Sequence, residues 1–477
     1  MHSDEFKKYA HQLVEWMGDY LANIESFPVK SQVRPGEITA QLPVSPPEKG
    51  EAFDQIFGDF EKIIIPGVTH WQHPSFFAYF PANSSPVSVL AEMLTATMGV
   101  QAMIWQTSPA AAELEERVMK WMADMLGLPA PFTGVIQDTA STATLCSLLT
   151  ARERYSKYEV NKGGLSGQAK FTCYCSREAH SSVDKAVRIA GIGHENLRKI
   201  AVDPNFAMVP EELERVIRED ISRKRLPLWV AATIGTTGCT AVDPLEAIAA
   251  LCRKYGLWLH VDGALGGTAL ILPEMRWMSK GIGGADSFVF NPHKWMFTNF
   301  DCSAYFVKDP GALIQTFEIL PEYLKTKEGD RVNNYRDWGI PLGRRFRALK
   351  LWFVIRHYGV DGLREKIRGH IRLAGELAER IKATSDFELL APVPLNTVCF
   401  RFRPDGTSDP DRLNALNSEL LEKLNGSGKL YLTHTKLNGR FTLRLVVGQT
   451  QVEERHVSAA WQRIQDTARM MPLAEAF

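Results

Sequence analysis

Five short apolar runs between residues 85 and 345 constrain the fold of this 477-residue chain more than any other feature. They are GVIQ, KFTCYC, LWVAATIG, LWLHVD and DSFVFN, and segments with helical spacing lie between them. A strand that is apolar at nearly every position is typical of a parallel sheet, because helices cover both faces of such a sheet. The pattern predicts a large α/β domain over residues 85–350.

The segments on either side of this domain have other patterns. Residues 1–84 combine an amphipathic helix at about 5–24, a proline-rich stretch and a short helix near 51–62. Because this segment buries little apolar surface alone, we expect it to pack on something else, and a second subunit is one candidate. Residues 351–477 start with a long helical pattern and end with three strand-like runs and a helix, which predicts a small α+β domain.

Composition excludes several classes of function. Lys and Arg together number 55, as do Asp and Glu, so no net charge favours nucleic acid or an anionic membrane. No apolar run reaches the roughly 18 residues of a membrane span, and the N-terminus does not resemble a secretion signal. The 7 scattered cysteines suit reduced thiols and lack zinc-site spacing. We expect a cytoplasmic enzyme that acts on a small molecule and binds no metal, nucleic acid or membrane.

Polar side chains follow the predicted strands at their carboxyl ends, where open α/β sheets bind ligands. The residues after GVIQ lead into a helix whose first N–H groups can hold an anion. The set consists of Thr139, Ala140 and Ser141 after GVIQ, His180 after KFTCYC, Thr236 and Thr237 after LWVAATIG, Asp262 and Ala264 at the end of LWLHVD, and Asn291, His293 and Lys294 after DSFVF.

Each of these residues also has an ordinary structural explanation. A Ser or Thr after a strand is most often a helix cap, a lone histidine is more often structural, and a lysine can extend its ammonium group to water. Together, however, they match the needs of pyridoxal 5′-phosphate (PLP): phosphate donors, a carboxylate for the pyridine nitrogen, a flat partner for the ring, and a lysine for the aldehyde. Asp262 and Lys294 suit the carboxylate and lysine roles.

Longer motifs cover nearly the whole chain. They are NPHKW followed by FDCSAYFVKDP, then CSREAHSSVDKA, LWLHVDGALGG, HPSFFAYFPANSS, SPAAAELE and IPLGRRFRALKLWF. Together they resemble the group II PLP-dependent decarboxylases, in particular the aromatic L-amino acid (dopa/tryptophan) decarboxylase branch in its bacterial form. The resemblance implies the fold-type I architecture of aspartate aminotransferase, with a mostly parallel seven-stranded sheet. It also implies a homodimer with shared active sites, in which residues 1–84 pack on the partner.

The resemblance assigns roles to single residues. Lys294 resembles the lysine that forms the Schiff base with PLP, and Asp262 the partner of the pyridine nitrogen. His180 resembles the imidazole stacked on the ring, and Tyr323 the tyrosine of a catalytic loop at about 317–335 that reaches into the neighbouring subunit. The remaining cofactor positions are Thr139, Ala140, Ser141, Asn291 and His293 at the phosphate, Thr237 near the ring, and Ala264 beneath it. The substrate positions are Trp71, Tyr79, Phe80, Pro81, Ala82, Met103 and Gly343.

The implied reaction converts an aromatic L-amino acid to its amine and CO2, with His180 or Tyr323 delivering a proton. The candidate substrates are dopa, tryptophan, 5-hydroxytryptophan, phenylalanine and tyrosine. By resemblance, a glycine at position 343 weakly favours indole substrates. Ala82, Met103 and Leu265 depart from the animal enzymes and leave the ring preference open. An aldehyde synthase, a transaminase or a decarboxylase of a non-aromatic amino acid is the alternative. A dinucleotide-binding oxidoreductase is disfavoured, because the glycines of KGIGGAD and GALGG lack the spacing of that fingerprint.

Overall fold

The computed structural model describes residues 1–167, 170–319 and 331–471. The chain forms two compact units. The larger unit comprises residues 82–378 and 391–399, and the smaller unit comprises residues 1–81, 379–390 and 400–477. None of the helices in the described ranges has the length and apolar character needed to span a bilayer.

A seven-stranded sheet forms the centre of the larger unit, in the order β1-β7-β6-β5-β4-β2-β3. Strand β7 runs antiparallel to both of its neighbours, β1 and β6, and the other pairs are parallel. All strands except β7 therefore point the same way, which confirms the predicted mostly parallel sheet. The strands are β1 (Thr133–Gln137), β2 (Phe171–Ser176), β3 (Leu197–Ile200), β4 (Leu226–Thr233), β5 (Trp258–Asp262), β6 (Ser287–Phe290) and β7 (Ser303–Val307).

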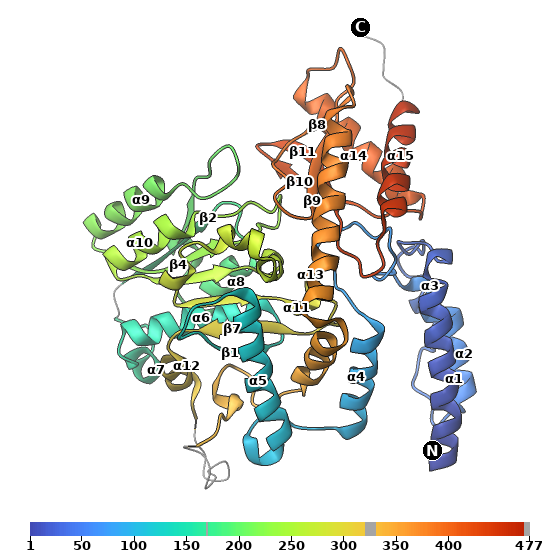
Figure 1. Ribbon diagram of the computed structural model, residues 1–477, viewed down its shortest axis with the longest axis horizontal. Coiled ribbons are helices and arrows are strands. Elements are labelled where there is room, and N and C mark those ends of the chain that lie inside the picture. Colours follow the sequence, from blue (N-terminus) through green and yellow to red (C-terminus); the bar gives the residue numbers. More distant parts are fainter. Residues whose placement is uncertain (168–169, 320–330, 472–477) are drawn as a thin grey trace. The chain divides into compact units, whose positions relative to one another are not determined.

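Helices cover both faces of this sheet (Figure 1). Trp229 and Ala231 of β4 pack with residues of α6 and α8 on one face, whereas α9 and α10 contact the other face. Consecutive strand residues point to opposite faces, so β4 is buried from residue 228 to 233. The helices of this unit are α4 (Pro86–Met98), α5 (Pro109–Leu126), α6 (Ala140–Tyr155), α7 (Glu159–Gly163), α8 (Ser182–Ile189), α9 (Pro210–Ser222), α10 (Leu245–Tyr255), α11 (Pro292–Trp295), α12 (Pro310–Phe317) and most of α13 (Arg347–Lys382).

A buried hydrogen-bond network joins α6 to the centre of the sheet. Ser147 Oγ accepts hydrogen bonds from the indole N–H groups of Trp229 and Trp258, each at 3.0 Å, and lies 3.0 Å from Ser287 Oγ. The imidazole of His260 approaches the same Ser287 hydroxyl at 2.9 Å, and burial lowers the pKa of His260 to about 4. His260 is therefore neutral, and every partner in this apolar layer is polar but uncharged, which avoids the cost of a buried charge.

The smaller unit contains a four-stranded sheet in the order β10-β11-β9-β8. Residues 1–81 belong to this unit, where Phe76 forms a β-bridge with Tyr431. The strands are β8 (Phe387–Leu389), β9 (Thr397–Phe402), β10 (Thr433–Leu437) and β11 (Arg440–Val446). The helices are α1 (Ser3–Ala22), α2 (Phe53–Asp59), α3 (Ile65–Gly67), α14 (Pro410–Gly426) and α15 (Glu454–Arg469).

Candidate active site

The carboxyl ends of β1, β2, β4, β5 and β6 lie at one edge of the larger sheet, because these strands run in the same direction. Asp262 is the last residue of β5, and Lys294 lies in α11, directly after β6. The charges of Asp262 and Lys294 both act on the imidazole of His180, which follows β2. The fold thus brings together three of the four residues that the sequence predicts to be catalytic, each from a different strand end.

Hydrogen bonds fix the chain on both sides of Lys294. Lys294 N donates to the carbonyl of Asn291 at 2.9 Å, and Asn83 N donates to the carbonyl of His293 at 3.0 Å. The next residue, Trp295, is fully buried, and its Nε1 donates to His370 Nδ1 at 2.9 Å. The Lys294 side chain itself is only partly buried, so a fixed backbone presents an amine to the sheet edge.

Asp262 is a buried carboxylate with 6% of its surface exposed. Its Oδ1 accepts a hydrogen bond from Ala264 N at 2.9 Å, and the carbonyl of Ala264 accepts one from Asn291 N at 3.0 Å. The turn after β5 is therefore tied to the turn that carries Lys294. A buried carboxylate is stable when a cation or several donors oppose it, and a protonated pyridine nitrogen is such a cation.

His180 is oriented through its Nδ1 atom. Ser182 N donates to Nδ1 at 3.1 Å, and Ser182 Oγ lies 2.9 Å from the same atom. Desolvation lowers the pKa of His180, Asp262 acts in the opposite direction, and Lys294 lowers it further. The neutral ring consequently carries its proton on Nε2, which leaves that nitrogen as a donor while the flat ring can stack on a cofactor.

The first turn of α6 provides hydrogen-bond donors at the same edge. Thr139 is the N-cap residue, and its Oγ1 accepts from Thr142 N at 3.4 Å. Ala140 and Ser141 are the first two residues of the helix, so their N–H groups have no acceptor within it. A helix N-terminus of this kind favours an anion such as phosphate.

Two residues of the α11 turn add further donors. Asn291 Oδ1 accepts from Ser303 Oγ at 2.5 Å, which orients the amide so that Nδ2 is its donor. His293 Nδ1 accepts from Cys302 N at 2.9 Å, and burial lowers the pKa of His293 to about 3. His293 is therefore neutral with its proton on Nε2, and both side chains can donate to a phosphate without adding charge.

The two threonines after β4 differ in the structure. Thr236 is fully buried, and its Oγ1 accepts from Ala241 N at 3.0 Å, whereas the side chain of Thr237 is exposed. Thr236 thus stabilises the turn, and Thr237 is available for a ligand. With the donors of α6 and α11, the Asp262 carboxylate, the His180 imidazole and the Lys294 amine, the residues at this edge fit PLP.

Four predicted substrate residues belong to the smaller unit. The rings of Trp71 and Tyr79 are stacked with centroids 5.7 Å apart, and Tyr79 Oη lies 3.2 Å from Tyr431 Oη. The guanidinium of Arg444 lies 4.6 Å from the centroid of the Phe80 ring, and Pro81 is buried. Sequence reasoning missed Tyr431 and Arg444, because they lie some 350 residues from this aromatic segment and carry no motif of their own.

The other three predicted substrate residues, Ala82, Met103 and Gly343, lie in the larger unit. Tyr323, the fourth residue predicted to be catalytic, falls outside the described residues. Ala82 precedes Asn83, whose N–H binds the His293 carbonyl as described above. Met103 is half-buried, and Gly343 is exposed. These two residues lie on segments that hydrogen-bond to each other, since Ala102 N donates to the carbonyl of Arg344 at 2.9 Å.

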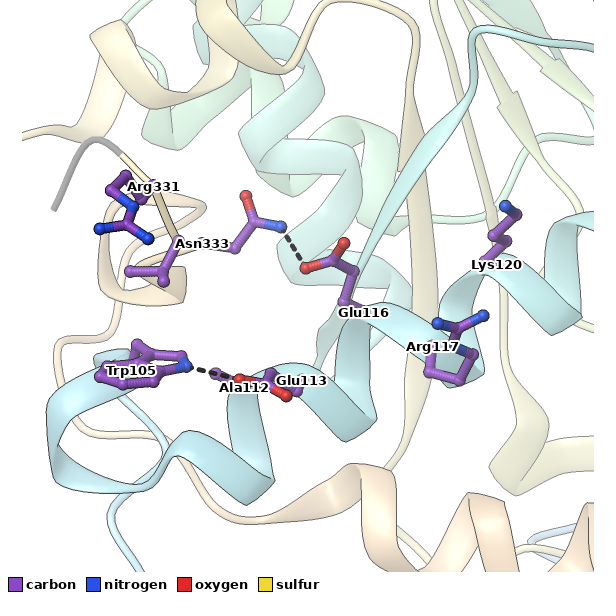
Figure 2. Close-up of a pocket in the computed structure, with 9 residues that line it drawn as sticks. Trp105, Ala112, Glu113, Glu116, Arg117, Lys120, Arg331 and Asn333 are labelled. Atoms are coloured by element: carbon purple, nitrogen blue, oxygen red, sulfur yellow. Dashed lines mark hydrogen bonds between the residues drawn. The ribbon is translucent and has the colours of Figure 1, made fainter. Parts of the chain in front are cut away.

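A cavity of about 380 Å³ borders the Met103 segment (Figure 2). It lies between the start of α5 and residues 331–333. Trp105 Nε1 donates to Glu113 Oε1 at 2.9 Å, and Asn333 Nδ2 donates to Glu116 Oε2 at 2.9 Å. No predicted cofactor residue lines this cavity. Within the described ranges, no group of three or more His, Cys, Asp or Glu side chains is arranged to hold a metal ion.

Comparisons with known proteins agree with this chemistry. Tryptophan decarboxylase 2 of Oryza sativa subsp. japonica is 44% identical, over 98% of this chain and 95% of the relative. Tyrosine decarboxylase 4 of Petroselinum crispum is 43% identical, over 99% of this chain and 95% of the relative. Phenylacetaldehyde synthase of Arabidopsis thaliana is 44% identical, over 98% of this chain and 96% of the relative.

The fold is also similar to solved structures. The crystal structure of Oryza sativa TDC with PLP and tryptamine matches with a TM-score of 0.95 and 35% identity, over 98% of both chains. This confirms the predicted fold-type I architecture and PLP as the cofactor. In sequence, residues 35–403 of this chain match the family described as the pyridoxal-dependent decarboxylase conserved domain. The chain therefore belongs to the pyridoxal-dependent decarboxylase family.

Proposed function

We propose that this chain decarboxylates an aromatic L-amino acid to the corresponding amine and CO2. The observation that carries the proposal is the meeting of Lys294, Asp262 and a neutral, oriented His180 at one sheet edge, beside donors for a phosphate. When bound, PLP supplies an electron sink for the electron pair that the departing CO2 leaves behind. The relatives named as tryptophan and tyrosine decarboxylases support an aromatic side chain on the substrate.

The residues of the chain have distinct tasks in this proposal. Lys294 binds the cofactor's aldehyde, and Asp262 holds a proton on the pyridine nitrogen. The phosphate is held by the first turn of α6 together with Asn291 and His293. His180 stacks on the ring, and its Nε2–H is one candidate for delivering the proton to Cα of the substrate. Tyr323 is the other candidate for that proton transfer.

A substrate panel tests the proposed reaction. The PLP-loaded chain is given tryptophan, 5-hydroxytryptophan, tyrosine, dopa and phenylalanine, with glutamate as a control, and CO2, amine, ammonia and peroxide are measured. We expect equal amounts of CO2 and amine from at least one aromatic substrate. Absence of CO2 from all five aromatic substrates would contradict the proposal.

An aldehyde synthase is the second candidate, because one of the 44% identical relatives is a phenylacetaldehyde synthase. By resemblance, Tyr323 and His180 are both of the decarboxylase type. The same panel separates the two reactions, since an aldehyde synthase releases ammonia and peroxide in amounts comparable to CO2. Amine without ammonia favours the decarboxylase.

Replacing Tyr323 with phenylalanine tests its role in proton transfer. We expect Tyr323→Phe to bind PLP normally but to form amine at least about 100-fold more slowly, because a positioned general acid contributes about that much. Cofactor absorbance and amine chromatography measure the two effects. Tyr155→Phe, at an exposed position on α6, serves as the matched control and should behave like the unaltered chain. Normal amine formation by Tyr323→Phe would remove Tyr323 from the mechanism.

A homodimer is part of the proposal. Leu90, Leu94 and Met98 lie on one face of α4 at four-residue spacing and are 55%, 46% and 51% exposed. Ile340 and Leu342 are similarly exposed at 53% and 46%. Large exposed apolar side chains at regular spacing are typical of an interface with another protein. They support the second subunit that the resemblance implies.

A charge on this face should weaken the dimer. We expect Leu94→Glu to raise the dimer dissociation constant at least about tenfold, because burying an unpaired carboxylate is costly. Light scattering after size-exclusion chromatography measures the mass at several concentrations. Ile221→Glu, at a 46% exposed position on α9, is the control and should leave the mass unchanged. An unchanged dimer in Leu94→Glu would show that α4 is not in the interface.

The lineage of the chain is also a proposal. The motifs led us to expect a bacterial form, whereas the three relatives described above come from plants. The bacterial assignment therefore rests on the motifs alone, and the cytoplasmic location likewise stays a prediction.

A further inference from the structure

Strand β1 forms one end of the larger sheet, so only one of its sides pairs with a strand, β7. Helix α5 packs against β1 (Figure 1). Two side chains bind the backbone of Ile136 where a second strand is missing. Ile136 N donates to Glu115 Oε1 at 2.8 Å, and Arg344 Nη2 donates to the carbonyl of Ile136 at 2.8 Å. A carboxylate and a guanidinium thus supply the acceptor and the donor that a neighbouring strand supplies elsewhere in a sheet.

Glu115 and Arg344 also bind each other. Arg344 Nη2 donates to Glu115 Oε1 at 2.6 Å, and the two residues are 7% and 1% exposed, respectively. Arg344 Nη1 donates to the carbonyl of Ala102 at 3.3 Å. A buried ion pair keeps its geometry, because either partner alone would be a costly buried charge. We call Glu115 and Arg344 the edge clamp, because they hold Ile136 at the open edge of β1.

The residue that the edge clamp holds lies close to both groups of predicted phosphate donors. Ile136 is followed by Gln137, the last residue of β1, and Thr139 soon afterwards is the N-cap of α6. Gln137 pairs across the sheet with Ser303 of β7, whose Oγ donates to Asn291 Oδ1 at 2.5 Å. The end of β1 therefore adjoins the first turn of α6 along the chain and the Asn291 amide across the sheet.

The first turn of α6 also contacts the turn that follows Asp262. Ala264 packs against the apolar cluster that contains Ala140, the first residue of α6. Ala264 N donates to Asp262 Oδ1 at 2.9 Å. A shift of the end of β1 would therefore move the N–H groups of α6 relative to the turns that carry Asp262 and Lys294. Those two residues follow β5 and β6, which the edge clamp does not contact.

We propose that Glu115 and Arg344 are positioning residues for the cofactor phosphate. By holding β1, they place the first turn of α6 and the Asn291 amide where both can donate to the phosphate. Hydrogen bonds to an anion are strong only at short distance and good alignment, so a shifted strand end weakens phosphate binding while Lys294 and Asp262 still bind the ring. The inference rests on the proposed function, in which these donors hold the phosphate of PLP.

A comparison of PLP with pyridoxal, which has the same ring and aldehyde but no phosphate, tests the inference. The cofactor is removed from the full chain, and each compound is titrated back while absorbance reports its binding to Lys294. The measured quantity is the Kd of pyridoxal divided by the Kd of PLP. We expect Glu115→Leu combined with Arg344→Met to lower this ratio at least about tenfold, the value of one hydrogen bond to a charged group. Binding of pyridoxal should be unchanged.

The double variant is chosen because replacing both members of a buried ion pair with apolar residues leaves no lone buried charge. Arg344→Lys is the second variant, in case the double variant does not fold. It keeps the charge but offers one nitrogen in place of the two that Arg344 uses, so the ratio should fall at least about threefold. Glu115→Gln should retain the selectivity, because its Oε1 can still accept from Ile136 N and Arg344 Nη2.

Asp220→Leu combined with Arg198→Met is the matched control. Asp220 is 2% exposed and pairs with Arg198 at 2.7 Å, and Arg198 lies in β3 at the opposite end of the sheet. Removing this pair should leave the ratio unchanged, because a general loss of stability weakens the binding of both compounds alike.

A ratio within twofold of that of the unaltered chain in Arg344→Lys, and in the double variant where it folds, overturns the inference. It leaves the proposed reaction intact, because the substrate panel tests that reaction separately. Equal binding of PLP and pyridoxal by the unaltered chain would remove the predicted phosphate donors, and this inference would fail with them. An equally large fall in the control would also overturn it, since the effect would then not be specific to β1.

Discussion

Lys294→Ala is expected to lower amine formation at least about 1,000-fold and to abolish covalent trapping of the cofactor by borohydride, because it removes the amine that binds the aldehyde. Lys294 lies directly after β6, and hydrogen bonds to neighbouring residues fix the backbone on both sides of it. The Asp262 carboxylate and the groups that can donate hydrogen bonds to a phosphate lie at the same edge of the sheet. The decrease is measured by amine chromatography, and the trapping by mass spectrometry of the reduced protein.

Lys350 is the competing lysine in this experiment. It is only 1% exposed, and burial lowers its pKa to about 8, which is favourable for a nucleophilic amine. It lies on α13, however, and its Nζ is paired with Glu92 Oε2 at 2.9 Å. Lys350→Arg keeps the charge and should retain the cofactor absorbance. A borohydride label on the peptide that contains Lys350, with none on Lys294, would refute the assignment.

Asp262→Asn is expected to lower kcat/KM at least about 100-fold while PLP stays bound to Lys294. The amide has nearly the same shape as the carboxylate and can still accept from Ala264 N, so the turn should keep its structure. It lacks the negative charge that keeps the pyridine nitrogen protonated, and the unprotonated ring is a weaker electron sink. Absorbance spectra report the bound cofactor, and a substrate assay reports the rate.

Asp262→Glu is the partner variant, because it restores the charge with one extra methylene group. We expect it to recover part of the activity that Asp262→Asn loses. If Asp262→Asn decarboxylates normally with PLP bound, then the carboxylate has no role at the pyridine nitrogen. A variant that loses PLP altogether would instead indicate a role in binding, which the spectra distinguish from a loss of rate.

The large sheet was predictable from sequence because its central strands are buried on both faces. Such strands are apolar at nearly every position, and the polar residue that ends each one stands out, as with Asp262 after LWLHV. β7 and β3 are not among the five predicted runs; for β3 the reason is its composition, since β1 at the opposite edge is recognised. In β3, Arg198 and Lys199 are not buried, so the run is not continuously apolar.

The hydrogen-bond roles at the site could not be predicted from sequence. Thr236 and Thr237 are adjacent and chemically identical, and only the fold decides that Thr236 stabilises a turn while Thr237 is exposed. The neutral state of His293 depends on its burial and on Cys302 N, which donates to Nδ1 from the start of the next strand segment.

The sequence by itself determined which residue types stand at the strand ends, because the alternation of apolar runs and polar termini is a local property of the chain. It also determined the family, through motifs that cover nearly its whole length. Only the tertiary structure decided that the turns of Asp262 and Lys294 are joined through Ala264 and Asn291, and that Asn83 binds the carbonyl of His293. These properties arise from contacts between distant segments, and burial and partner geometry set each of them.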